Sequence, residues 1–233
     1  MSNPRQDLLS LLARRSFQLG QFKLSSGAIS DYYIDCRTTT LHAEGAHLVG
    51  HVFLNAIRAR SWKPDAIGGL TMGADPIVVA VSMTSSHTRP IHGFLVRKSE
   101  KSHGTGQRIE GFRQKGARVV VVDDVCTTGA STIQAIEAAR EYGFEVVGAM
   151  CLVEREEAGR QAVAQAAAPA EFVSLYTADE VRAEHMKLQE KAKNPGRSKP
   201  PIFAVSAKCD FCDRPAVTNI PGNRCAVHTS EEE

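Results

Sequence analysis

Residues 119–132, with the sequence VVVVDDVCTTGAST, constrain the fold of this chain more than any other segment. Four consecutive valines predict a strand that is buried on both faces, as in parallel sheets. Two carboxylates, Asp123 and Asp124, end this apolar run, and a loop of small residues follows them. Apolar residues at helical spacing then continue to Gly143. The segment is therefore predicted to form a strand, a loop and a helix of an α/β sheet.

The loop and the start of the helix have the composition of an anion site. Backbone N–H groups converge at such a turn, and the helix dipole adds positive potential there. Thr127, Thr128, Ser131 and Thr132 supply hydroxyl donors, and Gly129 lets the backbone approach a ligand closely. The preceding carboxylates repel phosphate but accept hydrogen bonds from vicinal hydroxyls. The segment is thus predicted to hold a ribose 5-phosphate.

Strand-like and helix-like segments alternate through the rest of the chain. The predicted strands are residues 66–69, 92–96, 118–122, 146–153 and 172–176. Helices predicted near residues 75–86, 130–142 and 156–167 separate most of them. This alternation indicates a mainly parallel sheet with helices on both faces. Ligands of such sheets bind beyond the carboxyl ends of the strands, where the acidic pair falls.

The N-terminal part has a different pattern. An amphipathic helix is predicted over residues 5–17 and a second one over residues 43–60. Between them, residues 22–27 and 32–35 are typical of a short hairpin with a polar turn.

Proline and glycine mark a domain limit near the C-terminus. Residues 177–180, TADE, are a capping box that opens a last helix to about Ala192. The sequence NPGRSKPP, residues 194–201, then breaks the periodicity. We predict a main domain at residues 1–192, a linker at 193–206 and a separate tail at 207–233.

The composition narrows the class of protein. A chain of 233 residues is long enough for one α/β domain with a small appendage, and 42% of it is hydrophobic. Its net charge of +2 is too small to suggest a protein that binds nucleic acids in general. No apolar run approaches the ~20 residues of a membrane span, and the first residues lack the apolar core expected of a signal peptide. Single, scattered cysteines argue against a disulfide framework, so a cytoplasmic location is expected.

A long polar segment separates two of the predicted strands. It contains four basic residues within seven positions, Arg97, Lys98, Lys101 and His103, followed by glycines. Long loops inside compact domains are often functional. A basic, glycine-containing loop of this kind is typical of a lid that closes over a polyphosphate.

These motifs resemble those of a known family. The strand followed by DDVCTTGAST resembles the 5-phosphoribosyl 1-diphosphate (PRPP) signature of the type I phosphoribosyltransferases. The pattern RKxxKxHG resembles the catalytic loop of orotate phosphoribosyltransferases. FxLxSG with the following YY resembles their hood, which implies a small hood at about residues 17–40. The resemblance covers roughly residues 7–177. It implies a type I phosphoribosyltransferase fold and transfer of the phosphoribosyl group from PRPP to orotate. The products would be orotidine 5′-monophosphate and diphosphate, in de novo pyrimidine biosynthesis.

The resemblance also implies roles for individual residues. Lys101, Arg97 and His103 would be catalytic. The residues implied to bind PRPP, together with Mg²⁺, are Arg97, Lys98, Lys101, His103, Asp123, Asp124, Val125, Cys126, Thr127, Thr128, Gly129, Ala130 and Ser131. Several loop residues of the family reach the neighbouring subunit's substrate, which implies a homodimer with shared sites. The segment 70–74 would support the diphosphate through its backbone.

The base would be bound by Thr127, Arg155 and Tyr33, with Arg155 suited to the carboxylate of orotate. Two positions depart from the pattern: Ser25 replaces a lysine that many members have, and segment 70–74 lacks a lysine that some have. Relatives that act on 6-oxopurines usually have an aspartate where Thr127 lies. Two alternatives stay open, namely a different base and a PRPP-sensing regulator on the same fold.

The tail contains a second motif. Cys209 and Cys212 are followed, after twelve intervening residues, by Cys225 and His228. Two short chelating pairs at this spacing are typical of a tetrahedral structural zinc site. Metal binding would supply most of the folding free energy of a segment with so little apolar material. The sequence does not indicate what such a site serves.

Overall fold

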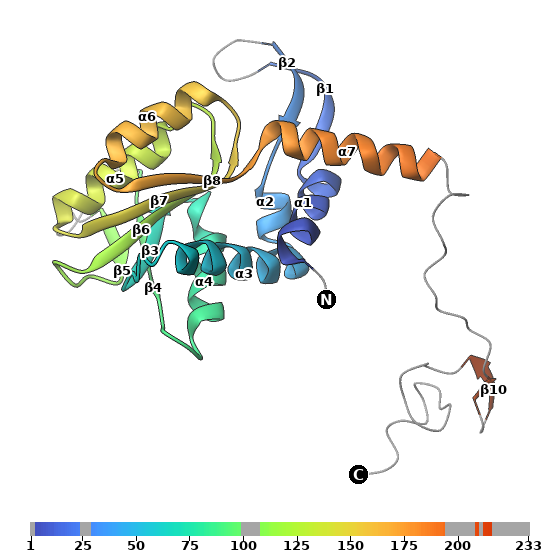
Figure 1. Ribbon diagram of the computed structural model, residues 1–233, viewed down its shortest axis with the longest axis horizontal. Coiled ribbons are helices and arrows are strands. Elements are labelled where there is room, and N and C mark those ends of the chain that lie inside the picture. Colours follow the sequence, from blue (N-terminus) through green and yellow to red (C-terminus); the bar gives the residue numbers. More distant parts are fainter. Residues whose placement is uncertain (1–2, 24–28, 99–107, 194–207, 210–211, 216–233) are drawn as a thin grey trace. The chain divides into compact units, whose positions relative to one another are not determined.

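The computed structural model of the chain describes residues 3–23, 29–98, 108–193, 208–209 and 212–215 (Figure 1). Some residues singled out in the sequence lie outside this set, namely Ser25, Lys101, His103, Cys225 and His228.

A six-stranded sheet forms the centre of the fold. Its strands, in spatial order, are β5 (Ile109–Gly111), β4 (His92–Val96), β3 (Ala66–Leu70), β6 (Arg118–Cys126), β7 (Glu145–Glu154) and β8 (Glu171–Thr177). Five strands run parallel, and β5 pairs antiparallel with β4 at one edge. The predicted, mainly parallel sheet is confirmed. The short edge strand β5 was not predicted.

The valines of β6 explain why this strand lies in the middle of the sheet. Val119 and Val121 pack into the core on one face, whereas Val120 and Val122 pack into the core on the other. The prediction that the strand ends at Val122 is wrong. Pairing with β7 continues to Cys126, because β7 is long enough to bond the backbone of the acidic residues as well. Both carboxylates are therefore held on a strand rather than in a loop.

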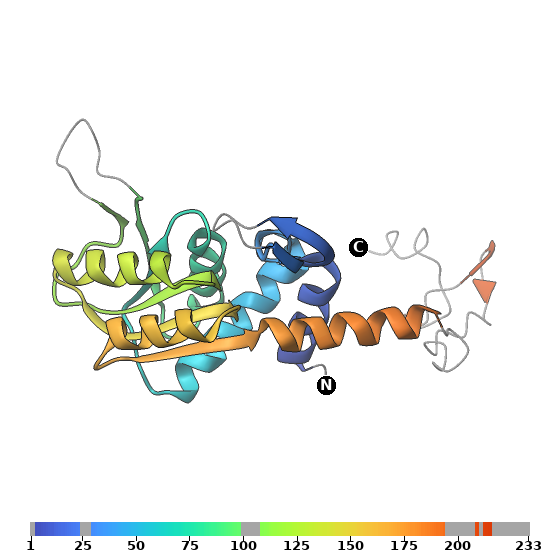
Figure 2. The same cartoon turned by 90° about the horizontal axis from the view of Figure 1, so that it is seen from above.

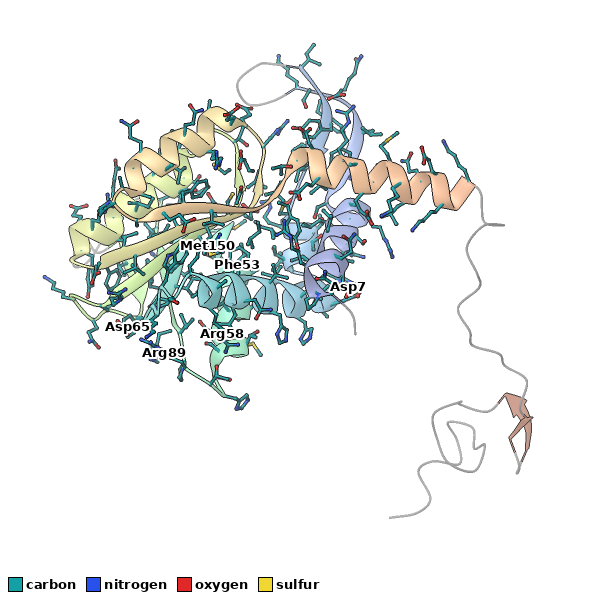
Figure 3. The ribbon with its side chains drawn as sticks, in the orientation of Figure 1. Asp7, Phe53, Arg58, Asp65, Arg89 and Met150 are labelled. Carbon is teal, nitrogen blue, oxygen red and sulfur yellow. The ribbon has the colours of Figure 1, made fainter. Side chains whose placement is uncertain are left out.

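Two helices cover each face of the sheet, as predicted (Figure 1). The helices α3 (Ala43–Ala59) and α4 (Ala74–Ser85) cover one face, and α5 (Ala130–Tyr142) and α6 (Glu157–Ala167) cover the other. Figure 3 labels Phe53 of α3 and Met150 of β7, which are both fully buried in the first of these layers.

The hood consists of the helix α1 (Pro4–Arg15), the hairpin of β1 (Phe17–Lys23) and β2 (Ile29–Ile34), and the short helix α2 (Arg37–Thr40) (Figure 2). The predicted hairpin is confirmed, although its first strand begins earlier than expected. Phe17 was placed in the first helix, which was wrong. The helix ends at Arg15, because the carbonyl of Ser16 instead accepts a bond of 2.9 Å from the N–H of Asp35 beside the hairpin.

The last helix, α7 (Ala178–Lys193), begins with the predicted capping box. The N–H of Thr177 donates to Glu180 Oε2 at 2.8 Å, and the N–H of Glu180 donates to Thr177 Oγ1 at 3.1 Å. The chain forms two compact units, Met1–Leu188 and Gln189–Glu233. The predicted limits of the domain, linker and tail stay predictions.

The second unit contains a small antiparallel pair, β9 (Lys208–Cys209) and β10 (Cys212–Pro215). In this pair Cys209 lies opposite Cys212. Of the described helices in the chain, none is both long and apolar enough to cross a membrane.

Candidate active site

A cavity of about 560 Å³ lies at the carboxyl ends of β3, β4, β6 and β7. Four groups of residues line it: the end of the hood, the segment after β3, the end of β6 with the following loop, and single residues after β4 and β7. They are Tyr33, Ile34, Asp35, Cys36, Arg37, Leu70, Thr71, Met72, Gly73, Lys98, Asp123, Asp124, Val125, Thr127, Ser131 and Arg155. This is the place where ligands of parallel sheets bind.

Hydrogen bonds fix both carboxylates of the acidic pair. Asp123 accepts bonds from the N–H of Asp124 at 3.0 Å and from Thr132 Oγ1 at 3.1 Å. Asp124 Oδ1 accepts a bond of 2.9 Å from the N–H of Val125. Burial, together with the negative charge of Asp124, raises the pKa of Asp123 to about 7. Burial also raises the pKa of Asp124.

The segment after β3 presses directly onto this pair. A Cβ on Gly73 would lie 2.5 Å from Asp124 Oδ1 and 2.9 Å from Asp123 Oδ1. Only glycine fits here without movement of the segment. The backbone of residues 70–73 and the carboxylates thus form two adjacent walls of the cavity.

The loop after β6 has the features of the predicted anion site. Gly129 has a φ of +78°, a left-handed conformation that favours glycine, and it is the residue that precedes α5. Gly129 supplies no side-chain cap, and apart from the N–H of Ala130, which donates to Thr128 Oγ1 at 3.4 Å, N–H groups of the first helical turn stay available for a ligand. Thr127 and Ser131, on the two sides of this turn, line the cavity.

A basic residue reaches the cavity from β4. Lys98 lines it, and the carbonyl of Lys98 accepts a bond of 3.3 Å from Gln134 Nε2 of α5. Arg97 does not line the cavity; its guanidinium pairs with Glu110 at 3.2 Å. The other basic residues of the predicted lid lie outside the described residues.

The residues expected to bind a base also border the cavity. Arg155 follows β7 directly, and its N–H donates to the carbonyl of Cys126 at 2.8 Å. Its guanidinium bonds Ser30 Oγ at 3.1 Å and lies over the ring of Tyr32. Tyr33 and Thr127 line the same cavity. The structure therefore brings together three residues that are far apart in the sequence.

Four residues of the cavity were missed in the sequence, Ile34, Asp35, Cys36 and Arg37, and two of them are charged. The guanidinium of Arg37 donates two hydrogen bonds to Asp35, from Nε to Oδ1 at 2.9 Å and from Nη2 to Oδ2 at 3.0 Å. This pair lowers the pKa of Asp35, and the charge of Arg37 opposes the rise in the pKa of Asp124. Opposite charges two positions apart at the start of a helix were the available signal. Such a pattern is too common to point to a site by itself.

Other predicted residues lie beside the cavity rather than on its wall. Cys126 is fully buried in the core beneath α5, and Thr128, Gly129 and Ala130 are not lining residues. Their backbone still shapes the loop. Among the described residues no group of three or more metal-ligating side chains is assembled.

Comparison with known proteins agrees with this arrangement. The model of the phosphoribosyl transferase domain matches residues 38–167. An orotate phosphoribosyltransferase of Aquifex aeolicus is 41% identical over 181 residues, which cover 76% of this chain and 97% of that protein. One from Streptomyces avermitilis is 42% identical over 182 residues, or 78% and 98% of the two chains.

Solved structures extend the match to three dimensions. The crystal structure of Mycobacterium tuberculosis orotate phosphoribosyltransferase in complex with Fe(III) dicitrate is 37% identical, with a TM-score of 0.68 over 77% of this chain and 99% of that one. The same protein in complex with PRPP gives a TM-score of 0.65 at 33% identity and the same coverage. The predicted type I phosphoribosyltransferase fold is confirmed, and this chain belongs to the orotate phosphoribosyltransferase family.

Proposed function

We propose that the cavity at the ends of β3 and β6 is where this enzyme transfers the phosphoribosyl group of PRPP to orotate. The observation that carries this assignment is the meeting of three features in one cavity. A buried carboxylate pair, the uncapped start of α5 and the guanidinium of Arg155 all border it. They match a ribose, a phosphate and an acidic base, respectively.

PRPP is oriented by the residues on the β6 side. The loop Thr127–Ser131 takes the 5-phosphate, and Asp123 and Asp124 accept hydrogen bonds from the ribose hydroxyls. The backbone of residues 70–73 and the ammonium of Lys98 face the diphosphate. Support comes from the geometry of these walls and from the M. tuberculosis relative, whose structure was solved with PRPP.

The donor set also fits Mg²⁺. Two carboxylates whose pKa values are raised by burial favour a neighbouring cation, and Mg²⁺ prefers such oxygen donors while keeping several waters. Asp123 and Asp124 would hold the ion through these waters, next to the diphosphate and ribose oxygens. When bound, it supplies positive charge that offsets the charge of the diphosphate.

The base is placed beside Arg155, where Thr127 begins the phosphate loop. Arg155 pairs with the carboxylate of orotate, and Tyr33 and Thr127 flank the ring. The pyrimidine nitrogen attacks C1′ of PRPP as the bond to the diphosphate breaks, through a transition state with oxocarbenium character. Lys101, Arg97 and His103 neutralise the charge that develops on the leaving diphosphate.

We further propose that the enzyme is a homodimer. An apolar groove of about 750 Å³ lies between α3 and α4, bordered by the exposed side chains of Leu41, Val79 and Met83. The buried hydroxyl of Thr40 lines this groove and has no partner among the described residues. Helix α4 starts directly after Gly73 of the active site, so a second copy in this groove would lie beside that site. Light scattering should show a dimer, and Met83→Glu should dissociate it; a monomeric parent protein would contradict this.

The tail is proposed to hold a structural zinc ion. Cys209 and Cys212 lie opposite each other on a two-stranded turn, which is the local geometry of one chelating pair. Cys225 and His228 would complete the site. Elemental analysis should find one zinc per chain, and Cys209→Ser should remove it.

Because the thiols of Cys36, Cys126 and Cys151 are free, we place the enzyme in the reducing cytoplasm.

The first test is orotate consumption, followed by ultraviolet absorbance, with PRPP and Mg²⁺ present. Loss of orotate that added diphosphate reverses is the expected result. Lys101→Ala should lower kcat by about 10²- to 10³-fold with a much smaller change in PRPP affinity. The substitution removes a positive charge that stabilises the leaving diphosphate in the transition state. Wild-type turnover in this variant would overturn the catalytic assignment. Bound PRPP without orotate loss would overturn the choice of base.

A further inference from the structure

Arg155 is held in place by residues that do not touch the cavity. Its side chain extends from the end of β7 to the hood, where Nη2 donates to Ser30 Oγ at 3.1 Å. Its guanidinium carbon lies 5.0 Å from the centre of the Tyr32 ring, within cation–π range. Neither Ser30 nor Tyr32 lines the cavity. Both therefore act on the arginine rather than on a ligand.

Tyr32 is itself fixed from behind by a series of ring contacts. Its ring stacks on Phe17, with centroids 5.4 Å apart and an interplanar angle of 17°. Phe17 in turn contacts the ring of His185 of α7 at 5.0 Å. The Nδ1 atom of His185 lies 2.7 Å from the carbonyl oxygen of Ala13. The hood and α7 thus determine where the Tyr32 ring lies.

These supports leave the charge of Arg155 uncompensated. A hydroxyl and an aromatic face orient a guanidinium without neutralising it, and no carboxylate in the described part of the chain pairs with Arg155. Arg182 differs, because it lies 6.0 Å from the same ring but pairs with Asp31 at 2.8 Å. Of the two arginines at Tyr32, Arg155 is the one that lines the cavity and stays available for an anion.

We propose that Ser30 and Tyr32 are positioning residues that aim Arg155 at the carboxylate of the base, so that the hood sets the selectivity for an acidic pyrimidine. This inference rests on the proposed function of Arg155. Ser30 restricts one Nη atom, and the Tyr32 ring restricts the plane of the guanidinium. Bidentate pairing with a carboxylate requires both restrictions.

The test compares binding of two nucleotides that differ only in this carboxylate, orotidine 5′-monophosphate and uridine 5′-monophosphate. Calorimetry on the full-length enzyme gives the affinity ratio of the two ligands. We expect Ser30→Ala and Tyr32→Leu each to lower this ratio about fivefold to tenfold, with the affinity for uridine 5′-monophosphate nearly unchanged. Tyr32→Phe keeps the aromatic face and should keep the ratio. Tyr142→Leu, which removes an aromatic ring far along the chain on α5, is the matched control and should leave the ratio unchanged.

The outcomes separate this inference from the proposed function. If Arg155→Ala lowers the ratio but Ser30→Ala and Tyr32→Leu do not, the positioning role is wrong and the role of Arg155 stands. If Arg155→Ala leaves the ratio unchanged, the assignment of the base site itself is wrong. An equal loss of affinity for both nucleotides in Ser30→Ala and Tyr32→Leu would indicate general damage and would also overturn the positioning role.

Discussion

The two halves of the active site are built in different ways. The PRPP half is nearly continuous in sequence, because one strand, one loop and one helix start provide both the carboxylates and the anion site. The base half joins Arg155 to a hood residue 125 positions away. Local backbone geometry shapes the first half, whereas docking of the hood against the sheet assembles the second.

Their electrostatics differ as well. In the PRPP half, burial raises the pKa of both carboxylates, that of Asp123 to about 7, so the charge of Asp123 depends on pH near neutrality. In the base half the charge belongs to the guanidinium of Arg155, which no carboxylate among the described residues neutralises. Changes to one half should therefore leave the other half's selectivity unaltered, which the Asp123/Asp124 double variant and Arg37→Gln test directly.

The largest effect is expected when both carboxylates of the PRPP half become amides. The double variant Asp123→Asn with Asp124→Asn should lower kcat/KM for PRPP by about 10³-fold, because two charge-assisted hydrogen bonds to the ribose are lost. Steady-state kinetics measures this loss. The preference for orotidine over uridine 5′-monophosphate should not change. Asp65→Asn, outside the cavity, is the control, and a similar loss there would contradict the assignment.

A smaller but more local effect is expected from Gly73→Ala. The added methyl group would meet both carboxylates of the pair at 2.5 and 2.9 Å, so residues 70–73 must move outward. We expect KM for PRPP to rise about 10- to 100-fold, which corresponds to a packing strain of ~1–3 kcal/mol. Gly116→Ala is the matched control, because its Cβ meets nothing within 4 Å and only its φ of +76° is unfavourable. That control should lose stability without a change in KM. An unchanged KM in Gly73→Ala would show that this segment does not face PRPP.

The same contrast explains what the sequence could predict. The carboxylates and the anion loop of the PRPP half were predicted from a single window, in which valines, carboxylates and small hydroxylated residues follow one another. Segment 70–73 was assigned only through the family resemblance. Arg155 and Tyr33 were located only through a family resemblance. Their own neighbours in sequence carry no chemical pattern, and only the fold places them on a common wall.

Errors in the predicted elements have a related cause. The end of β6 was misplaced because local composition changes at Asp123, whereas the ladder with β7 continues for three further residues. Phe17 was assigned to a helix because it fits the apolar spacing, but a long-range bond from Asp35 to Ser16 favours the strand. Arg37 and Asp35 were missed because an ion pair shows its relation to a distant carboxylate only after folding.

The third prediction uses the raised pKa of Asp123, about 7. Below this pH the carboxyl is protonated and cannot accept a charge-assisted hydrogen bond from the ribose, so KM for PRPP should fall about tenfold between pH 6 and 8. Stability should change in the opposite direction. Because folding raises the pKa of Asp123, the protonated carboxyl stabilises the folded protein at low pH. This stabilisation is lost as the pH rises through 7. Asp123→Asn should therefore increase the unfolding free energy by about 2 kcal/mol at pH 8 and flatten the pH dependence of KM. Denaturant titrations at pH 5 and 8 measure the change in unfolding free energy. An Asp123→Asn variant less stable than wild type at pH 8 would contradict the predicted stabilisation.

The smallest effect concerns the link between the hood and the PRPP half. Arg37 lowers the pKa of Asp124, whereas Asp35 raises it. Arg37→Gln removes the favourable charge and leaves Asp35 without its partner, so both changes raise the pKa of Asp124. The pH midpoint of KM for PRPP should move upward, and the nucleotide preference of the base half should stay constant. Arg182→Gln, which removes the exposed pair between α7 and Asp31 of the hood, should not move the midpoint.

A downward movement in Arg37→Gln would show that Arg37 does not act on the carboxylates. A changed nucleotide preference would show instead that the two halves are coupled through the hood, because Arg37 and Tyr33 both line the cavity from that side.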